Sequence, residues 1–155
     1  MKQDRRPWQT SYRGTVYPWH CDHVGHMNVM WYVGKFDEAT WCFLAALGLT
    51  PGVLRSQGRG MAAVKQEISY TRELLAGDVV TVRTRLLEIR EKVIRFQHEM
   101  LNAETGELAA TTELTAVHMD TAARRATALP AAVLQRGQAL VEDAVSGGGG
   151  DGAQL

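Results

Sequence analysis

Apolar residues recur every three to four positions between residues 29 and 47, which is the period of an amphipathic α-helix. Phe36 and Phe43 belong to the apolar stripe, whereas Lys35 and Glu38 fall on the face that is expected to meet solvent. The pattern predicts one long helix with a single buried side.

Both ends of this segment carry residues typical of helix boundaries. Asn28 comes directly before the stripe, where its side-chain oxygen can accept a hydrogen bond from the first helical turn. Gly48 can end the helix, and Pro51 follows shortly after it. We expect a loop from there to the glycines Gly58 and Gly60.

Other parts of the chain show the alternation of apolar and polar residues that is typical of β-strands. The predicted strands cover residues 11–19, 62–71, 79–89, 93–101 and 107–120. The last four follow one another through short turns and are therefore expected to run antiparallel. A short amphipathic helix is expected from Pro130 onward.

These elements predict the α+β class, with an antiparallel sheet of about five strands covered by one long helix. Residues 1–10 are expected to form an N-terminal extension, residues 11–145 a single domain, and residues 146–155 a disordered Gly-rich tail. One helix cannot cover every strand, and the sheet keeps open edges, so the pattern also favours self-association.

Composition and charge exclude several classes of partner. The chain has 155 residues, with 17 Lys and Arg against 17 Asp and Glu, so no net positive field favours nucleic acid or an anionic membrane. No apolar run approaches the roughly 20 residues that a membrane-spanning helix needs. Cys21 and Cys42 are too few for a disulfide framework, and the N-terminus lacks the apolar stretch of a secretory signal. A cytoplasmic location is therefore expected.

The loop before the long helix carries a motif. The segment 19–28, WHCDHVGHMN, is followed by Tyr32 and by FDEA at 36–39. Together they resemble the D-x-x-G-H-x-N…Y…F-[DE]-E-A pattern of hotdog-fold acyl-CoA thioesterases of the 4-hydroxybenzoyl-CoA thioesterase type. The resemblance covers about residues 11–120 and implies a hotdog fold, in which the sheet wraps around one long central helix. It also implies hydrolysis of an acyl-CoA by a homodimer or homotetramer with sites at subunit interfaces.

The resemblance implies roles for two residues. Asp22 matches the catalytic carboxylate of the family, which acts as nucleophile or general base, and the backbone N–H of Val29 matches the group that polarises the thioester carbonyl. The 4-hydroxybenzoyl enzymes carry Tyr or His at the Val29 position, so the resemblance does not extend to specificity for aromatic acids. Many members also carry an Asp where this chain has His20.

The chemistry of thioester hydrolysis suits such a site. A thioester has a good leaving group, so the enzyme needs an oriented attacking group and donors that stabilise the developing oxyanion. Asp22 could attack the carbonyl to form a mixed anhydride, or it could deprotonate a water molecule, and the sequence does not distinguish these routes. Neither route requires a cofactor.

Further residues are candidates for substrate binding, each with a simpler structural role as the alternative. His26, Asn28 and Tyr32 surround the expected helix start, where they could also orient the loop, cap the helix and pack against the sheet. Arg90 and Lys92 could bind the phosphates of coenzyme A, or they could simply protect a strand edge with charge.

A metal site is not expected, because the histidines at positions 20, 23 and 26 lack the partner spacing of zinc motifs.

Other functions compete with thioester hydrolysis. The same fold could provide a non-catalytic binding module for acyl-CoA or an acyl carrier, or a hydratase or dehydratase that acts on acyl-CoA. Asp37 and Glu38 are helical acids that would become the catalytic candidates if Asp22 had another role.

Overall fold

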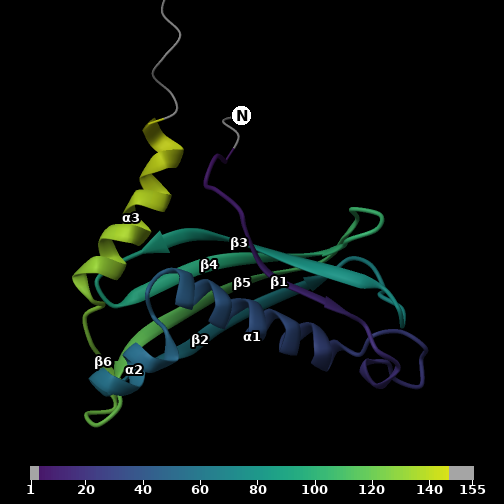
Figure 1. Ribbon diagram of the computed structural model, residues 1–155, viewed down its shortest axis with the longest axis horizontal. Helices are drawn as coiled ribbons and strands as arrows, with labels where there is room; N and C mark the ends of the chain where they lie inside the picture. The colour runs from purple at the N-terminus through teal and green to yellow at the C-terminus, as the bar shows by residue number, and fades with distance from the viewer. Residues whose placement is uncertain (1–3, 147–155) are drawn as a thin grey trace, which may run out of the picture.

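The computed structural model describes residues 4–146, and it has the helices and strands of one α+β unit (Figure 1). The strands are β1 (Gln9–Thr15), β2 (Arg59–Tyr70), β3 (Val79–Ile89), β4 (Val93–Asn102), β5 (Leu108–Asp120) and β6 (Arg125–Ala126). The helices are α1 (Val29–Ala46), α2 (Pro51–Gln57) and α3 (Ala131–Ser146), with one 3-10 turn, η1 (Pro18–His20).

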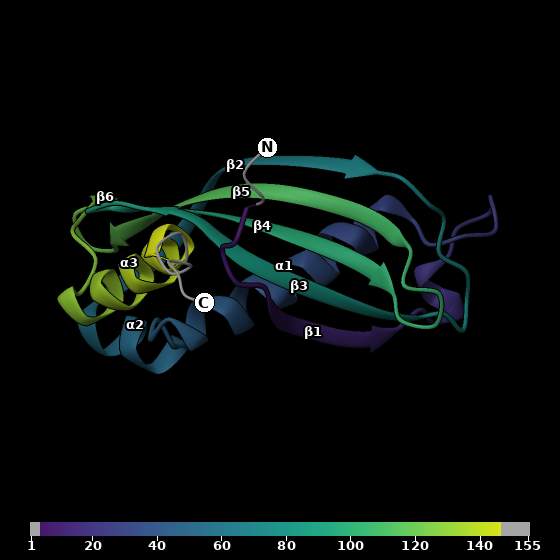
Figure 2. The same cartoon turned by 90° about the horizontal axis from the view of Figure 1, so that it is seen from above.

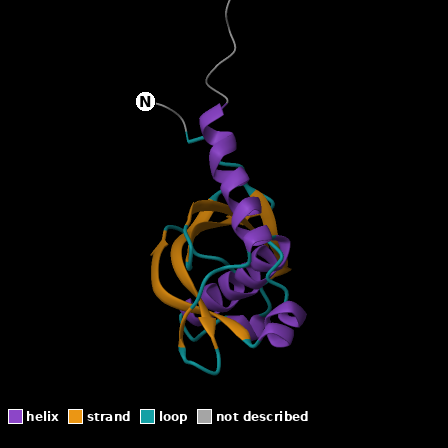
Figure 3. Ribbon diagram, turned by 90° about the vertical axis from the view of Figure 1, so that its left-hand side faces the viewer, coloured by secondary structure: helices purple, strands orange, loops and turns teal. Residues whose placement is uncertain are grey.

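The strands form one antiparallel sheet in the order β1-β3-β4-β5-β2, and β6 pairs with β5. The sheet curves around α1, which runs along its concave face (Figure 2). The end-on view of Figure 3 shows the same curvature. The predicted class, the long helix and the antiparallel sheet are confirmed.

The last four strands run antiparallel as predicted, but the second and third of the chain are not neighbours in the sheet. β2 pairs with β5 and β3 pairs with β1 and β4, so the segment 71–78 connects distant strands. This segment, which crosses from β2 to β3, is held in place by backbone hydrogen bonds and one buried apolar side chain. The N–H groups of Thr71 and Arg72 donate to the Ala109 carbonyl, and Leu74 is buried. Leu74 and these hydrogen bonds hold segment 71–78 across the end of the sheet.

The helix α2 lies where a loop was predicted. The Thr50 side chain accepts a hydrogen bond from the Val53 N–H, Pro51 occupies the first turn, and Leu54 is buried in the core. A capping residue followed by proline is a helix-start signal, so this element was detectable from the sequence.

The first strand and the last helix differ in extent from the predicted elements. β1 begins at Gln9, inside the expected N-terminal extension, and the chain leaves the strand before Pro18. α3 has 16 residues and reaches Ser146, so it is longer than expected. The rest of the predicted disordered tail lies outside the described residues.

Lys35 is the clearest misplacement. It was predicted to face solvent, but it is 3% exposed because β1 passes along that flank of α1. Its ammonium donates to the Tyr12 hydroxyl at 3.1 Å and to the Thr15 carbonyl at 3.4 Å. Burial lowers the pKa of Lys35, an effect that the charge of Glu38 opposes.

A buried histidine joins α1 to the sheet. His98 on β4 is fully buried, its Nε2 lies 2.8 Å from the Thr40 hydroxyl, and its Nδ1 lies 2.6 Å from the Thr84 hydroxyl. Thr40 already donates to the Phe36 carbonyl, so it must accept from Nε2–H. Nδ1 therefore accepts from Thr84. Burial lowers the pKa of His98 to about 3, which keeps the ring neutral.

We expect Thr84→Val to lower the free energy of unfolding by about 1–3 kcal/mol, because it leaves His98 Nδ1 buried without a donor. Urea unfolding would measure the loss. Thr81→Val is the matched control, since Thr81 lies on the same strand with a partly exposed side chain and should change stability by less than about 0.5 kcal/mol. Equal losses in both variants would contradict the role of this hydrogen bond.

Candidate active site

The start of α1 leaves one backbone donor free. Asn28 caps the helix, with its Oδ1 accepting from the Met30 N–H at 2.9 Å, and its carbonyl accepts from the Trp31 N–H at 3.0 Å. The Val29 N–H has no hydrogen-bond acceptor within the part of the chain that the structure describes. A free donor at the positive end of an 18-residue helix favours an oxyanion.

Asp22 is held beside this helix start by Asn28. The Asn28 Nδ2 donates to Asp22 Oδ2 at 2.7 Å, and the Val24 N–H donates to Asp22 Oδ1 at 2.8 Å. These two bonds, led by the one from Asn28, lower the pKa of Asp22, with help from the charges of His23 and His26. The carboxylate is therefore ionised at neutral pH, as both hydrolytic routes require.

The loop around Asp22 closes on itself. Cys21 and Met27 form an isolated antiparallel bridge, and the Asp22 N–H donates to the His26 carbonyl at 3.3 Å. Gly25 has a φ of 101°, a value that side chains rarely allow, so glycine suits the tip of this loop. The motif glycine therefore shapes the turn that presents Asp22.

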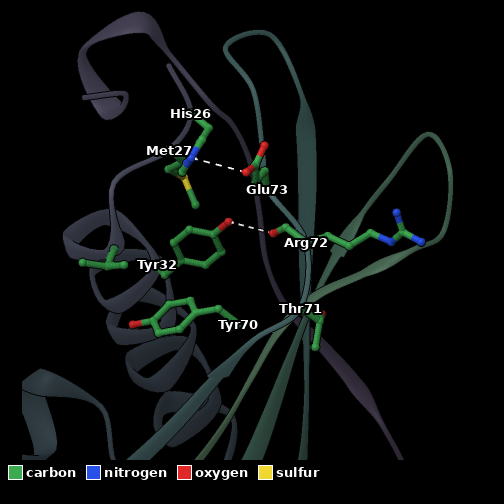
Figure 4. A pocket seen from close by; sticks show the side chains of 8 residues that line it. His26, Met27, Tyr32, Tyr70, Thr71, Arg72 and Glu73 are labelled. Carbon is green, nitrogen blue, oxygen red and sulfur yellow. Dashed lines mark hydrogen bonds and ion pairs between the residues drawn. The ribbon is translucent and has the colours of Figure 1, made fainter. Parts of the chain in front are cut away.

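A pocket of about 250 Å³ opens at the helix start (Figure 4). It is lined by His26, Met27, Val29, Tyr32, Tyr70, Thr71, Arg72 and Glu73. The Tyr32 hydroxyl donates to the Arg72 carbonyl at 3.0 Å, and His26 Nε2 lies 3.5 Å from Glu73 Oε1. One wall thus comes from the helix start and the other from the crossing segment 71–78.

The sequence-predicted site residues fall into two groups. Asp22, His26, Asn28, Val29 and Tyr32 lie together at the helix start, and the last of these both packs in the core and lines the pocket. The wall from Tyr70 to Glu73 was missed, because no motif marks it and its position depends on the crossing between β2 and β3.

Arg90 and Lys92 lie elsewhere. They are exposed in the turn between β3 and β4, at the end of the sheet opposite to the start of α1 (Figure 1). Arg90 pairs with Glu88 at 3.2 Å. Within one chain they do not join the pocket, so their contact with coenzyme A stays a prediction.

Residues 4–146 contain no group of three or more His, Cys, Asp or Glu side chains placed to hold a metal ion. His20 is buried against Trp31, and its Nδ1 accepts from the Tyr17 N–H at 2.9 Å. His26 faces Glu73 instead.

No helix among the described residues is long and apolar enough to span a membrane.

The family comparison agrees with the fold. The family model described as "Thioesterase-like superfamily" matches residues 16–137, so this chain belongs to that superfamily. The resemblance found in the loop and helix start is confirmed.

Two curated relatives of this chain have names that include betainyl-CoA thioesterase. The chain is 37% identical over 114 residues to an L-carnitine dehydrogenase/betainyl-CoA thioesterase of Agrobacterium fabrum, a match that covers 74% of this chain and 23% of that protein. The chain therefore spans about a quarter of that relative. It is also 27% identical over 133 residues to a betainyl-CoA thioesterase of Pseudomonas aeruginosa, covering 86% of this chain and 84% of that protein.

Solved structures share the fold. A Staphylococcus aureus protein in complex with CoA has a TM-score of 0.81 at 22% identity, covering 86% of this chain and 85% of its own. A 1,4-dihydroxy-2-naphthoyl-CoA thioesterase from Synechocystis has a TM-score of 0.74 at 21% identity, covering 88% of this chain and 97% of its own. The expected hotdog fold is confirmed.

We expect Asn28→Ala to raise the pKa of Asp22 toward its ordinary value, because it removes the largest cause of the lowered pKa. It should also reduce the free energy of unfolding by about 0.5–2 kcal/mol through the lost cap. NMR titration of the Asp22 carboxyl and urea unfolding measure the two effects. Thr50→Ala is the control, since it removes the cap of α2 without touching Asp22. An Asp22 pKa that does not move in Asn28→Ala would refute the link.

Proposed function

We propose that this chain hydrolyses an acyl-CoA thioester to the free carboxylic acid and coenzyme A. The observation that carries the proposal is the free Val29 N–H at the start of α1, beside a pocket and linked through Asn28 to an ionised Asp22. The curated relatives are named thioesterases, which supports this reaction.

The proposal gives each group at the site a role. The carbonyl oxygen of the thioester accepts from the Val29 N–H, and the helix N-terminus stabilises the negative charge that develops on it. If Asp22 attacks the carbonyl carbon, the C–S bond breaks, coenzyme A leaves as the thiolate, and water then hydrolyses the mixed anhydride to the free acid and Asp22. If Asp22 instead removes a proton from an attacking water, the C–S bond breaks as the intermediate collapses and that proton passes to the departing thiolate. His26, Asn28 and Tyr32 position the loop and the pocket wall, and no cofactor takes part.

We infer that the acyl group carries a positive charge. The two curated relatives described above include betainyl-CoA in their names, and a betainyl group carries a quaternary ammonium. In this chain the pocket beside Val29 includes the Tyr70 ring and the Glu73 carboxylate, both of which attract such a cation. A neighbouring cavity of about 340 Å³, between α1 and β2, is lined by a further carboxylate, that of Asp37.

The exposed edge of β2 supports self-association into a homodimer or homotetramer. Among residues 4–146, β2 pairs with β5 on one side only, and Val64 in its middle is 61% exposed. Met30 on the adjacent helix face is 62% exposed, which adds apolar surface beside the open edge. Antiparallel pairing of β2 with its copy about a two-fold axis would satisfy the edge and cover these side chains. Light scattering on the purified chain measures whether it is a monomer, dimer or tetramer.

A second subunit also provides a route by which Arg90 and Lys92 could reach coenzyme A bound to a neighbouring site. We infer a cytoplasmic location from the even charge and from the two cysteines, both of which are free thiols in the structure.

Thiol release from a panel of acyl-CoA thioesters, including betainyl-CoA, tests the reaction. Asp22→Asn removes the charge and nearly keeps the shape, so turnover should fall by about a hundredfold or more. No cleavage of any thioester by the wild type would sink the proposed reaction and favour a binding module. Full activity of Asp22→Asn would instead remove Asp22 from the mechanism and favour a helical acid such as Asp37.

The same assay tests the Val29 N–H through Val29→Pro. Proline is accepted at the first helical position, and Asn28 already has the extended backbone, with ψ of 146°, that a following proline requires. The variant should lose about 10²–10³ in kcat, because the donor is gone while the helix remains. Val29→Ala keeps the donor and should retain most of the activity. Equal activities of the two variants would remove Val29 from the mechanism.

A further inference from the structure

A second cavity, of about 510 Å³, lies on the other flank of α1 from the candidate active site. It is lined by Tyr12, Gly14, Thr15, Tyr17, Trp19, His20, Trp31, Gly34, Lys35 and Glu38. Around the helix axis, Trp31 and Glu38 point about half a turn away from Val29, so the two cavities occupy opposite sides of the same helix. The volume falls within the range of small-molecule sites.

Aromatic rings form the walls of this cavity. Tyr17 and Trp19 stack in parallel with ring centroids 4.4 Å apart, although Trp19 is 66% exposed. His20 and Trp31 contact each other with centroids 4.5 Å apart. Flat, partly exposed rings at the rim of a cavity offer a surface on which another planar ring can stack.

The floor and the rim of the cavity carry opposite charges. The buried Lys35 ammonium has three N–H groups, and its hydrogen bonds to Tyr12 and Thr15 use two of them. No carboxylate lies within 4.0 Å of this ammonium among the described residues. Glu38, which is exposed, adds an acceptor at the rim. The cavity therefore offers a donor and an acceptor between aromatic walls.

A glycine fixes part of this arrangement. A Cβ added at Gly14 would collide with the hydroxyl of Tyr12, which is the partner of Lys35. Only glycine lets the Tyr12 ring lie against β1 and place its hydroxyl beside the ammonium.

Because the cavity offers both a donor and an acceptor, it favours some classes of ligand over others. A quaternary ammonium would suit the rings and Glu38, but it has no lone pair to accept from Lys35. An aromatic carboxylate would suit Lys35, but it would meet the like charge of Glu38. A neutral aminopurine satisfies both groups, since a ring nitrogen accepts from Lys35, the exocyclic amine donates to Glu38, and the ring stacks on the aromatic wall.

We propose that this cavity binds an adenine ring, and that the ring is the adenine of coenzyme A. The second part rests on the proposed function, since it makes the cavity an anchor for the substrate whose thioester reaches the Val29 N–H. The pantetheine arm would then pass around the first turn of α1 from one flank to the other. Trp19 and Glu38 become residues that recognise the nucleotide, separate from the groups that act on the thioester.

Calorimetry with AMP tests the ring-binding part without any turnover. The wild type should bind AMP, and Trp19→Ala should weaken the binding by at least about tenfold through lost stacking. Trp41→Ala is the matched control, because Trp41 is also a partly exposed tryptophan, and it lies on α1 outside the cavity. No binding of AMP to the wild type, or equal weakening in both variants, overturns the proposal.

A comparison of AMP with IMP, in which a carbonyl replaces the exocyclic amine, tests the contact between that amine and Glu38. IMP should bind more weakly than AMP, because its carbonyl oxygen would face the Glu38 carboxylate. Glu38→Gln should shrink this preference, since the new amide can donate to the carbonyl. A preference that is unchanged in Glu38→Gln removes Glu38 from the site.

Two further comparisons complete the test. The first separates coenzyme A from other sources of adenine, and the second separates the adenine site from the proposed function. Tighter binding of adenosine 3′,5′-bisphosphate than of AMP or ATP supports coenzyme A, and the reverse order overturns that part. Trp19→Ala should raise KM for an acyl-CoA about tenfold, yet leave hydrolysis of the matching N-acetylcysteamine thioester unchanged. If the wild type binds AMP but cleaves neither thioester, the adenine site stands and the proposed function fails.

Discussion

The candidate site depends on the two hydrogen bonds that the side-chain amide of Asn28 makes. One end of the side chain accepts from the Met30 N–H and so begins α1, and the other end donates to Asp22 and holds its charge. An aspartate in place of Asn28 could still cap the helix, but it would offer no donor to Asp22. A serine could cap as well, but its short hydroxyl could not serve both partners at these distances. The residue that starts the helix therefore also lowers the pKa of the carboxylate.

The interior around α1 contains more polar chemistry than its apolar stripe suggests. His98 lies between aromatic rings with both nitrogens bonded to threonines, and Lys35 lies under β1 with a tyrosine and a carbonyl as acceptors. Such groups are costly to bury unless each polar atom finds a partner, so they fix the rotation of α1 against the sheet. A purely apolar helix could slide or turn against the curved sheet with smaller loss.

Local patterns predicted the parts of the fold that are determined locally. The stripe of α1, its Asn28 cap and the alternation of β3, β4 and β5 follow from neighbours in the chain, and the structure agrees with them. The pairing of β2 with β5 was not predictable in this way, because it depends on where the crossing 71–78 docks. The same limit applies to the site. The loop motif placed Asp22 and Val29 together, whereas Tyr70 and Glu73 enter the pocket only through the crossing, and Lys35 is buried only because β1 lies beside it.

The crossing 71–78 has a consequence for how assembly and ligand binding affect each other. It begins where β2 ends, and its first residues form the wall that faces the start of α1. In an oligomer paired through β2, the neighbouring chain would brace the strand from which this wall emerges. Filling the pocket and pairing the strand edge would then stabilise the same segment, and such coupling is reciprocal in free energy. Dilution would loosen the pocket, and substrate would hold the subunits together.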